Sequence, residues 1–227
     1  FMKTRDDARQ LAQALVDTGT AMGIKVVALI TNMDQPLGRT VGNALEVQEA
    51  LAILEGKGPD DSKSLTVTLA EHMLTVGRVP HPAPSSNARP VGDRAYKNDD
   101  SALHVMIESK LRDGSALQKF HEMVACHGGD LDAGLPEAKK QIPLLSPKAG
   151  YVSRAAADAI GRASLLLGAG RVKTTDSIDH AVGFSNLKKI GEAVEKDEPL
   201  CIIHSNGHED DAELLVLLKA AFDVSET

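Results

Sequence analysis

The spacing of apolar residues predicts a helical first half of the chain. Apolar positions recur every three or four residues, which is the pattern of a helix that buries one face. The predicted helices cover residues 4–19, 44–54, 61–77, 101–112 and 115–127. Thr4 and Asp7 have the spacing of a capping box at the start of the first helix. A short apolar run, Lys25–Thr31, predicts a strand between the first two helices.

The pattern changes after about Leu135, where short apolar runs bounded by glycine and proline replace the helical repeats. The predicted elements are strands at both ends of residues 141–154, a helix at 155–167, short strands within 179–206, a helix at 209–221 and a final short strand. Tight turns are expected at Lys189–Glu192 and Lys196–Pro199. We therefore expect two domains, residues 1–135 and 142–227.

A proline-rich segment, residues 78–100, interrupts the helical half. It contains four prolines and shows no apolar periodicity, which predicts a surface loop or insertion. His81 in this segment and His104 in the following helix are interpreted as solvated residues rather than as metal ligands.

Composition and charge narrow the function classes. The 227 residues carry a formal net charge of −7 at pH 7, which argues against a nucleic-acid partner. Aromatic residues make up 3% and tryptophan is absent, so few side chains could stack on bases. No apolar run is long enough to span a membrane, and no signal peptide is recognised. Cys126 and Cys201 lack metal-ligand spacing, so we expect reduced thiols in a cytoplasmic protein.

The segment between the predicted strand and the second helix, NMDQPLGRTVGN, is unusually rich in polar groups and glycine. The stretch that contains it, residues 28–51, resembles a signature of the pyrimidine nucleoside phosphorylase family, which includes thymidine phosphorylase. Further matches follow in the family's order: EGKGPDD, SPKAGYV, LGAGR, DHAVGF and KKIGEAVEKDEPL. Together they cover nearly the whole chain except the proline-rich segment. One departure is Asn32, where relatives carry aspartate. We expect a changed local hydrogen bond there, because asparagine can donate a hydrogen bond and ionised aspartate cannot.

The resemblance implies phosphorolysis of a pyrimidine nucleoside or deoxynucleoside, a pentosyl transfer in pyrimidine salvage. Phosphate attacks the anomeric carbon, the free base leaves and (deoxy)ribose 1-phosphate remains. The reaction needs stabilised negative charge and the exclusion of water. The family implies inorganic phosphate as co-substrate, no organic cofactor, and a homodimer in the complete protein. The implied fold is the helix-rich remainder of a mixed-sheet α/β domain, followed by a C-terminal α+β barrel-sandwich hybrid domain.

The resemblance also implies where the chemistry lies. In the family, the phosphate loop, a catalytic histidine and the residues that hold the base all precede the GSGAFMK run, whose phenylalanine matches Phe1. We therefore expect a sequence cut from a longer protein, with no catalytic residue in it and no activity of residues 1–227 alone. Phe1 corresponds to a residue that lines the base pocket; a packed residue at a cut end is the alternative.

A potassium site is the second implication for individual residues. The matching ligands are the carbonyl oxygens of Leu37 and Thr40 and the carboxylate of Glu49, at the hinge between domains. Hard cations prefer oxygen ligands, and irregular backbone leaves carbonyl groups free to bind them. The alternative is a simple loop followed by an exposed helical glutamate.

Two other functions stay open. One is a non-catalytic interaction or regulatory module that keeps the family scaffold. The other is a phosphoribosyltransferase, against which the C-terminal sandwich counts. The stretch KIGEAVEKDEPLCIIH also resembles half of a biotinyl or lipoyl carrier domain. Lys188 and Lys189 precede a glycine rather than occupying a hairpin tip, so no carried prosthetic group is expected.

Two polar clusters are interpreted as local structure. Ser177, Asp179 and His180 are expected to form a hydrogen-bonded turn rather than a nucleophile set. Helix capping and a solvated first turn, rather than a metal site, explain the group His204, Asn206, His208, Asp210 and Asp211.

Overall fold

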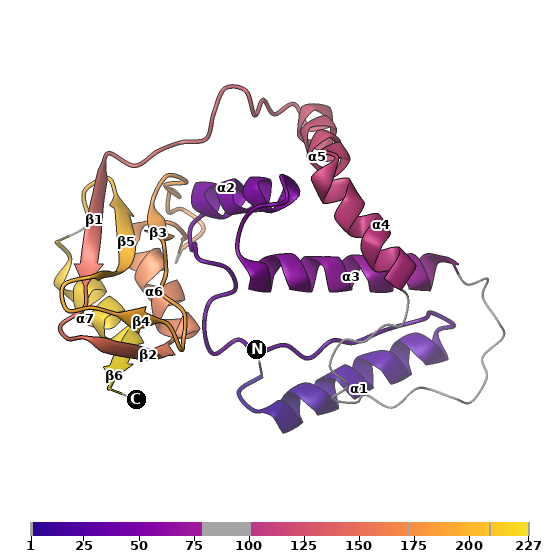
Figure 1. Ribbon diagram of the computed structural model, residues 1–227, viewed down its shortest axis with the longest axis horizontal. Helices are drawn as coiled ribbons and strands as arrows, with labels where there is room; N and C mark the ends of the chain where they lie inside the picture. Colours follow the sequence, from indigo (N-terminus) through magenta and orange to yellow (C-terminus); the bar gives the residue numbers. More distant parts are fainter. Residues whose placement is uncertain (1, 79–100, 172, 209, 227) are drawn as a thin grey trace. The chain divides into compact units, whose positions relative to one another are not determined.

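The computed structural model describes residues 2–78, 101–171, 173–208 and 210–226, and Phe1 lies outside them (Figure 1). The helices are α1 (Arg5–Ala21), α2 (Asn43–Leu54), α3 (Asp60–Arg78), α4 (Ser101–Arg112), α5 (Ser115–Cys126), α6 (Ala157–Leu167) and α7 (Ala212–Ala221). The strands are β1 (Lys140–Leu145), β2 (Gly150–Ala155), β3 (Gly183–Ser185), β4 (Ala193–Val194), β5 (Pro199–Ser205) and β6 (Phe222–Ser225). The chain forms two compact units: a first unit of residues 1–32 and 64–109, and a second unit of residues 33–63 and 110–227.

The helices begin and end close to their predicted positions. At the start of α1 the Thr4 side chain accepts a hydrogen bond from the Asp7 N–H at 3.2 Å and donates to the Asp7 carboxylate at 2.8 Å. The predicted cap is therefore confirmed. Gly168 ends α6 in the left-handed conformation, with φ of 102°, as glycine does after many helices.

The strand predicted at Lys25–Thr31 is wrong. These residues follow α1 as an irregular segment. In the described part of the chain, all of the strands lie in the second unit, and none of them pairs with residues 25–31. A strand is defined by hydrogen bonds to a neighbouring strand, so an apolar run alone cannot specify one.

Two small antiparallel sheets form the second unit. One has the strand order β1-β5-β3 and the other β4-β2-β6. β1 and β2 were predicted as strand, turn and strand, and both strands are confirmed. They do not pair with each other, however, because β1 pairs along β5 whereas β2 lies between β4 and β6. The turn between them therefore carries the chain from one sheet to the other.

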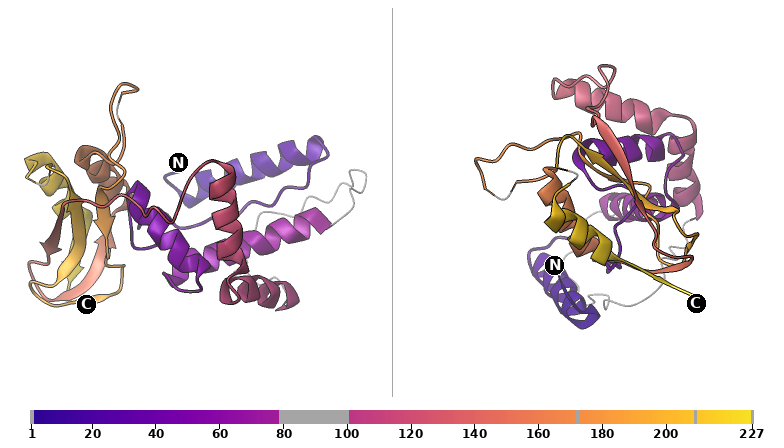
Figure 2. Two further views of the ribbon diagram at one scale, coloured as in Figure 1. Left: turned by 90° about the horizontal axis from the view of Figure 1, so that it is seen from above. Right: turned by 90° about the vertical axis from the view of Figure 1, so that its left-hand side faces the viewer.

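The hydrophobic core of the second unit lies between these sheets and the helices α6 and α7. The two helices pack side by side next to the strands (Figure 2). Side chains from both helices and both sheets contribute to it, and the most deeply buried are Val152, Ile160, Leu167, Phe184, Leu187, Ile203, Leu214 and Leu218. The mixture of helices with small antiparallel sheets agrees with the coarse fold class expected from the sequence.

A close backbone contact joins the start of α2 to β3. Val41 and Phe184 exchange two backbone hydrogen bonds, at 2.9 and 2.7 Å. The two segments approach closely because Gly42 follows Val41 and Gly183 precedes Phe184. A Cβ on Gly42 would lie 2.5 Å from the Val182 carbonyl oxygen, and a Cβ on Gly183 would lie 2.2 Å from the Val41 carbonyl oxygen. The glycines of the TVGN and DHAVGF motifs thus let two distant segments touch.

Candidate functional site

The candidate site is built around the connecting segment, residues 35–41, which leads into α2. Its end is fixed by the pairing of Val41 with Phe184. In its middle, the Leu187 N–H donates a hydrogen bond to the Arg39 carbonyl at 3.1 Å. The polar, glycine-containing stretch is therefore an anchored connection, and its shape is set by residues almost 150 positions away.

Glu49 turns back from α2 toward the connecting segment. One of its carboxylate oxygens accepts the Arg39 N–H at 2.8 Å. The other lies where a side chain on Gly38 would stand, because a Cβ there would be 1.8 Å from Glu49 Oε1. Burial raises the pKa of Glu49, although the Arg39 N–H and the Thr40 hydroxyl act in the opposite direction. The carboxylate is thus a partly buried charge held against irregular backbone.

Several oxygen atoms of the connecting segment accept no hydrogen bond from the described residues. The Thr40 hydroxyl is buried and close enough to Glu49 to affect its pKa, yet it has no hydrogen bond of acceptable geometry within the described residues. The carbonyl oxygens of Leu37 and Thr40 likewise accept no hydrogen bond in the described part of the chain. These groups, with one carboxylate, are the oxygen ligands that a hard cation uses. By chemical type, these groups are compatible with the cation site expected from the resemblance, which stays a prediction.

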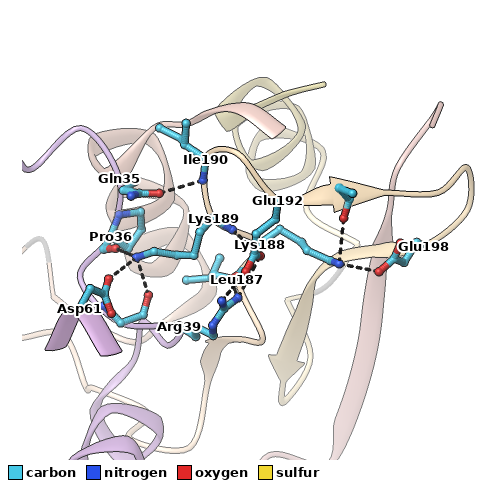
Figure 3. Close-up of polar contacts among 12 residues, drawn as sticks. Gln35, Pro36, Arg39, Asp61, Leu187, Lys188, Lys189, Ile190, Glu192 and Glu198 are labelled. Atoms are coloured by element: carbon cyan, nitrogen blue, oxygen red, sulfur yellow. Dashed lines mark hydrogen bonds and ion pairs between the residues drawn. The ribbon is translucent and has the colours of Figure 1, made fainter. Parts of the chain in front are cut away.

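Lys189 holds the connecting segment from the other side. Its ammonium group donates to the carbonyls of Pro36 and Gly38, the latter at 2.9 Å, and to the Asp61 carboxylate at 2.7 Å (Figure 3). Its side chain is only 13% exposed. An ammonium group has three N–H donors, and each of them has a partner here.

Asp61 completes a ring of contacts around Gly38. Its carboxylate accepts the Gly38 N–H at 3.2 Å, while Lys189 binds the Gly38 carbonyl. Burial alone would raise the pKa of Asp61. The hydrogen bond from Lys189 and the N–H groups of Ser62 and Gly38 outweigh that effect, so the pKa lies below its ordinary value. Asp61 therefore stays ionised as the counter-ion of Lys189.

A second ion pair lies beside the first. The two terminal guanidinium nitrogens of Arg39, Nη1 and Nη2, each donate to one carboxylate oxygen of Glu192, and Nη1 also donates to the Leu187 carbonyl at 3.1 Å. The hydrogen bond from Arg39 lowers the pKa of Glu192 to about 2. Glu192 in turn accepts the Lys189 N–H at 2.9 Å, and the Gln35 side chain accepts the Ile190 N–H at 2.9 Å. The connecting segment and the turn at residues 187–192 thus interlock (Figure 3).

The sequence did not indicate these roles for Lys189 and Glu192. Both were assigned to a tight turn, and the turn itself is confirmed by the hydrogen bond from Glu192 N–H to the Lys189 carbonyl. Their partners are more than 120 positions away in the sequence, so no local pattern points to them. A lysine pair followed by Ile-Gly-Glu within a motif shared with the family was the only signal.

The polar clusters of the sequence are local structure only in part, because His204 contacts the Ser185 hydroxyl of β3 at 2.7 Å and Asn206 contacts Asp179, 27 positions away. Asp179 accepts the Ala181 N–H at 3.0 Å and the Asn206 side chain at 2.7 Å. Asp211 caps α7 by accepting N–H groups of its first turn. Within the described residues no three histidine, cysteine or acidic side chains are grouped as a metal site. His104 binds Glu71 at 2.8 Å, and His81 lies outside the described residues.

The two cysteines are free thiols, as predicted. Cys201 is buried between the strands, and burial raises its pKa to about 12, so it is an unreactive core residue. Cys126 is exposed at the end of α5. Among the described helices, none combines the length and the apolar character needed to cross a membrane.

Comparisons with known proteins agree with the resemblance. Residues 151–225 match the model of the pyrimidine nucleoside phosphorylase C-terminal domain. The chain is 42% identical over 216 residues to the pyrimidine-nucleoside phosphorylase of Geobacillus stearothermophilus, and 39% identical over 211 residues to that of Bacillus subtilis. The alignments cover 93% and 91% of this chain but 46% and 45% of the relatives. The chain therefore spans about half the length of the curated relatives it matches, and the resemblance is confirmed over nearly all of it.

Proposed function

We propose that this chain works as part of a pyrimidine nucleoside phosphorylase, a pentosyltransferase that moves ribose or deoxyribose from a pyrimidine base to inorganic phosphate. The observation that supports this proposal best is the similarity to two such enzymes over more than nine-tenths of the chain. The motifs of that similarity also have structural tasks in this chain, since two of their glycines permit the contact between Gly42 and Gly183. We further propose a cytoplasmic homodimer that serves pyrimidine salvage.

In this reaction the bond from the anomeric carbon to the base nitrogen breaks, and a bond to a phosphate oxygen forms. The base leaves with the electron pair and takes up a proton. Phosphate and nucleoside must be held together, and water must be kept away from the anomeric carbon. We assign no catalytic residue to this chain. Its proposed contribution is a rigid support: residues 142–227 as a barrel-sandwich domain, residues 1–135 as part of the α/β domain, and Phe1 at the base pocket.

We also propose that the connecting segment helps to bind a potassium ion. The ligands would be the carbonyl oxygens of Leu37 and Thr40 and the carboxylate of Glu49. The two carbonyls, which accept no hydrogen bond from the described residues, and the buried Thr40 hydroxyl support the assignment. When bound, the ion would neutralise Glu49 and stiffen the backbone around it. In the full-length enzyme, Glu49→Gln should reduce the dependence of activity on potassium; superimposable potassium titrations for both proteins would remove Glu49 from the site.

The test of the proposed function is whether release of the base requires inorganic phosphate. The full-length protein is mixed with thymidine or uridine, with and without phosphate, and the free base is followed by its absorbance. We expect release in phosphate and almost none in a phosphate-free buffer. Release at the same rate in both buffers would identify a hydrolase instead. A properly folded full-length protein that releases no base would favour the non-catalytic interaction module.

A further inference from the structure

We infer that Lys189 is a positioning residue, which holds the connecting segment in the shape that leaves the Leu37 and Thr40 carbonyls free for a ligand. The inference rests on the proposed function for its consequence in catalysis. Its structural part, that Lys189 orders the segment, stands on the contacts of the chain itself. Lys189 is proposed to act through the backbone that it binds and not through contact with a substrate.

Lys189 binds more than one backbone group of the connecting segment. Its ammonium binds the carbonyls on both sides of Leu37, those of Pro36 and Gly38. Asp61, held by the same ammonium, binds the Gly38 N–H at 3.2 Å. The Leu37 carbonyl is therefore left between two fixed neighbours and receives no hydrogen bond within the described residues.

The charged side chain of Lys189 is largely buried. Exposed ion pairs contribute little to stability, because water competes for both partners. The Lys189 side chain is only 13% exposed, so its charge must be satisfied by protein groups. Loss of the side chain would leave the Pro36 and Gly38 carbonyls and the Asp61 carboxylate without their shared donor. We expect the segment to loosen as these groups turn toward water.

The turn that carries Lys189 is held in place by its own hydrogen bonds. Its backbone lies in the turn at residues 187–192, where the Glu192 carboxylate accepts hydrogen bonds from the Lys189 backbone N–H and from Nη1 and Nη2 of Arg39. Strand β5 supports this turn through the hydrogen bond from the Lys188 N–H to the Leu200 carbonyl at 2.9 Å. The ammonium is thus presented from a fixed turn next to a buried core, as a positioning group requires.

The charged side chains around the connecting segment do not balance one another. The charged side chains of the segment and its partners are three carboxylates, Glu49, Asp61 and Glu192, and two cations, Arg39 and Lys189. With all of them ionised, one negative charge is left over, which suits a single monovalent cation. Without Lys189 the excess doubles, and the Pro36, Gly38 and Asp61 oxygens lose the cation that they share.

The experiment compares Lys189→Met with Lys188→Met in the full-length protein. Lys188 is the matched control, since it is the neighbouring lysine and forms an ion pair with Glu198 but does not contact the connecting segment. The first readout is trypsin cleavage after Arg39, which lies in the segment. We expect cleavage at least about tenfold faster in Lys189→Met than in the wild type, and no change in Lys188→Met.

The second readout is the potassium dependence of the thermal midpoint without substrate, with choline chloride as the ionic-strength control. We expect the half-saturating potassium concentration to rise about tenfold in Lys189→Met and to stay unchanged in Lys188→Met. A kinetic titration should show the same shift in kcat rather than only in KM. Should Lys189→Met fail to fold, Asp61→Asn tests the same ring, because it keeps an acceptor oxygen but removes the counter-charge.

The outcomes separate the two proposals. Equal cleavage after Arg39 in the wild type and Lys189→Met would overturn the inference, as would equal acceleration by Lys188→Met. Cleavage that accelerates in Lys189→Met alone supports the positioning role even if the wild type shows no response to potassium, in which case only the cation site is rejected. Absence of phosphorolysis in the wild type would reject the proposed function and would leave the cleavage result intact.

Discussion

At the scale of single residues, Gly38 has two reasons to be glycine. Its φ of +70° lies in the left-handed region, and a Cβ would stand 1.8 Å from Glu49 Oε1 and 2.8 Å from the Ser62 hydroxyl. The first reason is a local cost of side chains at that φ, and the second is a clash with the carboxylate that faces the segment.

Gly38→Ala should therefore lower the free energy of unfolding by roughly 2–4 kcal/mol, more than the backbone strain alone explains. Gly23→Ala is the matched control, because Gly23 has a φ of +74° but nothing within 4 Å of the added carbon. We expect about 1 kcal/mol for the control. Urea unfolding of both variants measures the difference, and equal losses would mean that Glu49 does not occupy the space beside Gly38.

The ion pair of Glu192 makes the stability of the protein depend on pH. The hydrogen bond from Arg39 lowers its pKa from 4.5 to about 2. A carboxyl group with a lowered folded-state pKa stabilises the protein above its unfolded pKa, and this contribution is lost as the pH falls from about 4.5 toward 2.

Glu192→Gln should lower the free energy of unfolding at pH 7 by about 1 kcal/mol, a value reduced for the screening of a side chain that is one-third exposed. Near pH 2.5 the wild type has itself lost much of this contribution, so the difference between the two proteins should shrink. Urea unfolding at both pH values provides the measurement. A difference that stays constant with pH would show that the Arg39 pair does not bias the ionisation of Glu192.

At the scale of elements, α7 separates buried from exposed positions within one turn. Leu218 is fully buried in the core of the second unit, whereas Val216 is 69% exposed. Leu218→Ala should cost about 2–5 kcal/mol of unfolding free energy, because it removes packed methyl groups and leaves a cavity. Val216→Ala should change it by less than about 0.5 kcal/mol. Comparable losses in thermal or urea unfolding would contradict the assigned packing of α7.

The elements also show which features the sequence could predict. Helices have local signals, so the cap at Thr4 and the stop at Gly168 are both where the pattern indicates them. Strand pairing is not local. The apolar run Lys25–Thr31 was therefore mistaken for a strand, and the placement of β1 and β2 in different sheets was not foreseen.

The sequence likewise indicated some residues of the candidate site and not others. Glu49 and the connecting segment were indicated by the family resemblance, and the structure turns the Glu49 carboxylate toward that segment. The cation assigned to Leu37, Thr40 and Glu49 stays a prediction. Lys189 and its partners could not be found from the sequence, because Pro36 and Lys189 lie 153 positions apart and meet only through the fold.

At the scale of the whole molecule, the proposed role of the described residues is support rather than chemistry. The second unit has a contiguous core, and within it residues 35–41 interlock with the turn at residues 187–192. The predicted boundary between residues 135 and 142 and the barrel-sandwich topology stay predictions. Since the chain spans about half the length of the relatives, the proposed reaction requires the full-length enzyme, and residues 1–227 alone should not release base.

The most direct measurement of the central claim identifies the sugar product. The full-length protein is incubated with deoxyuridine or thymidine in phosphate buffer, and the reaction is followed by phosphorus NMR. Phosphorolysis joins a phosphate oxygen to the anomeric carbon, so a new resonance of deoxyribose 1-phosphate should grow in step with the free base. Free base that accumulates without any new phosphorus resonance, together with free deoxyribose, would contradict the assignment and identify a nucleoside hydrolase.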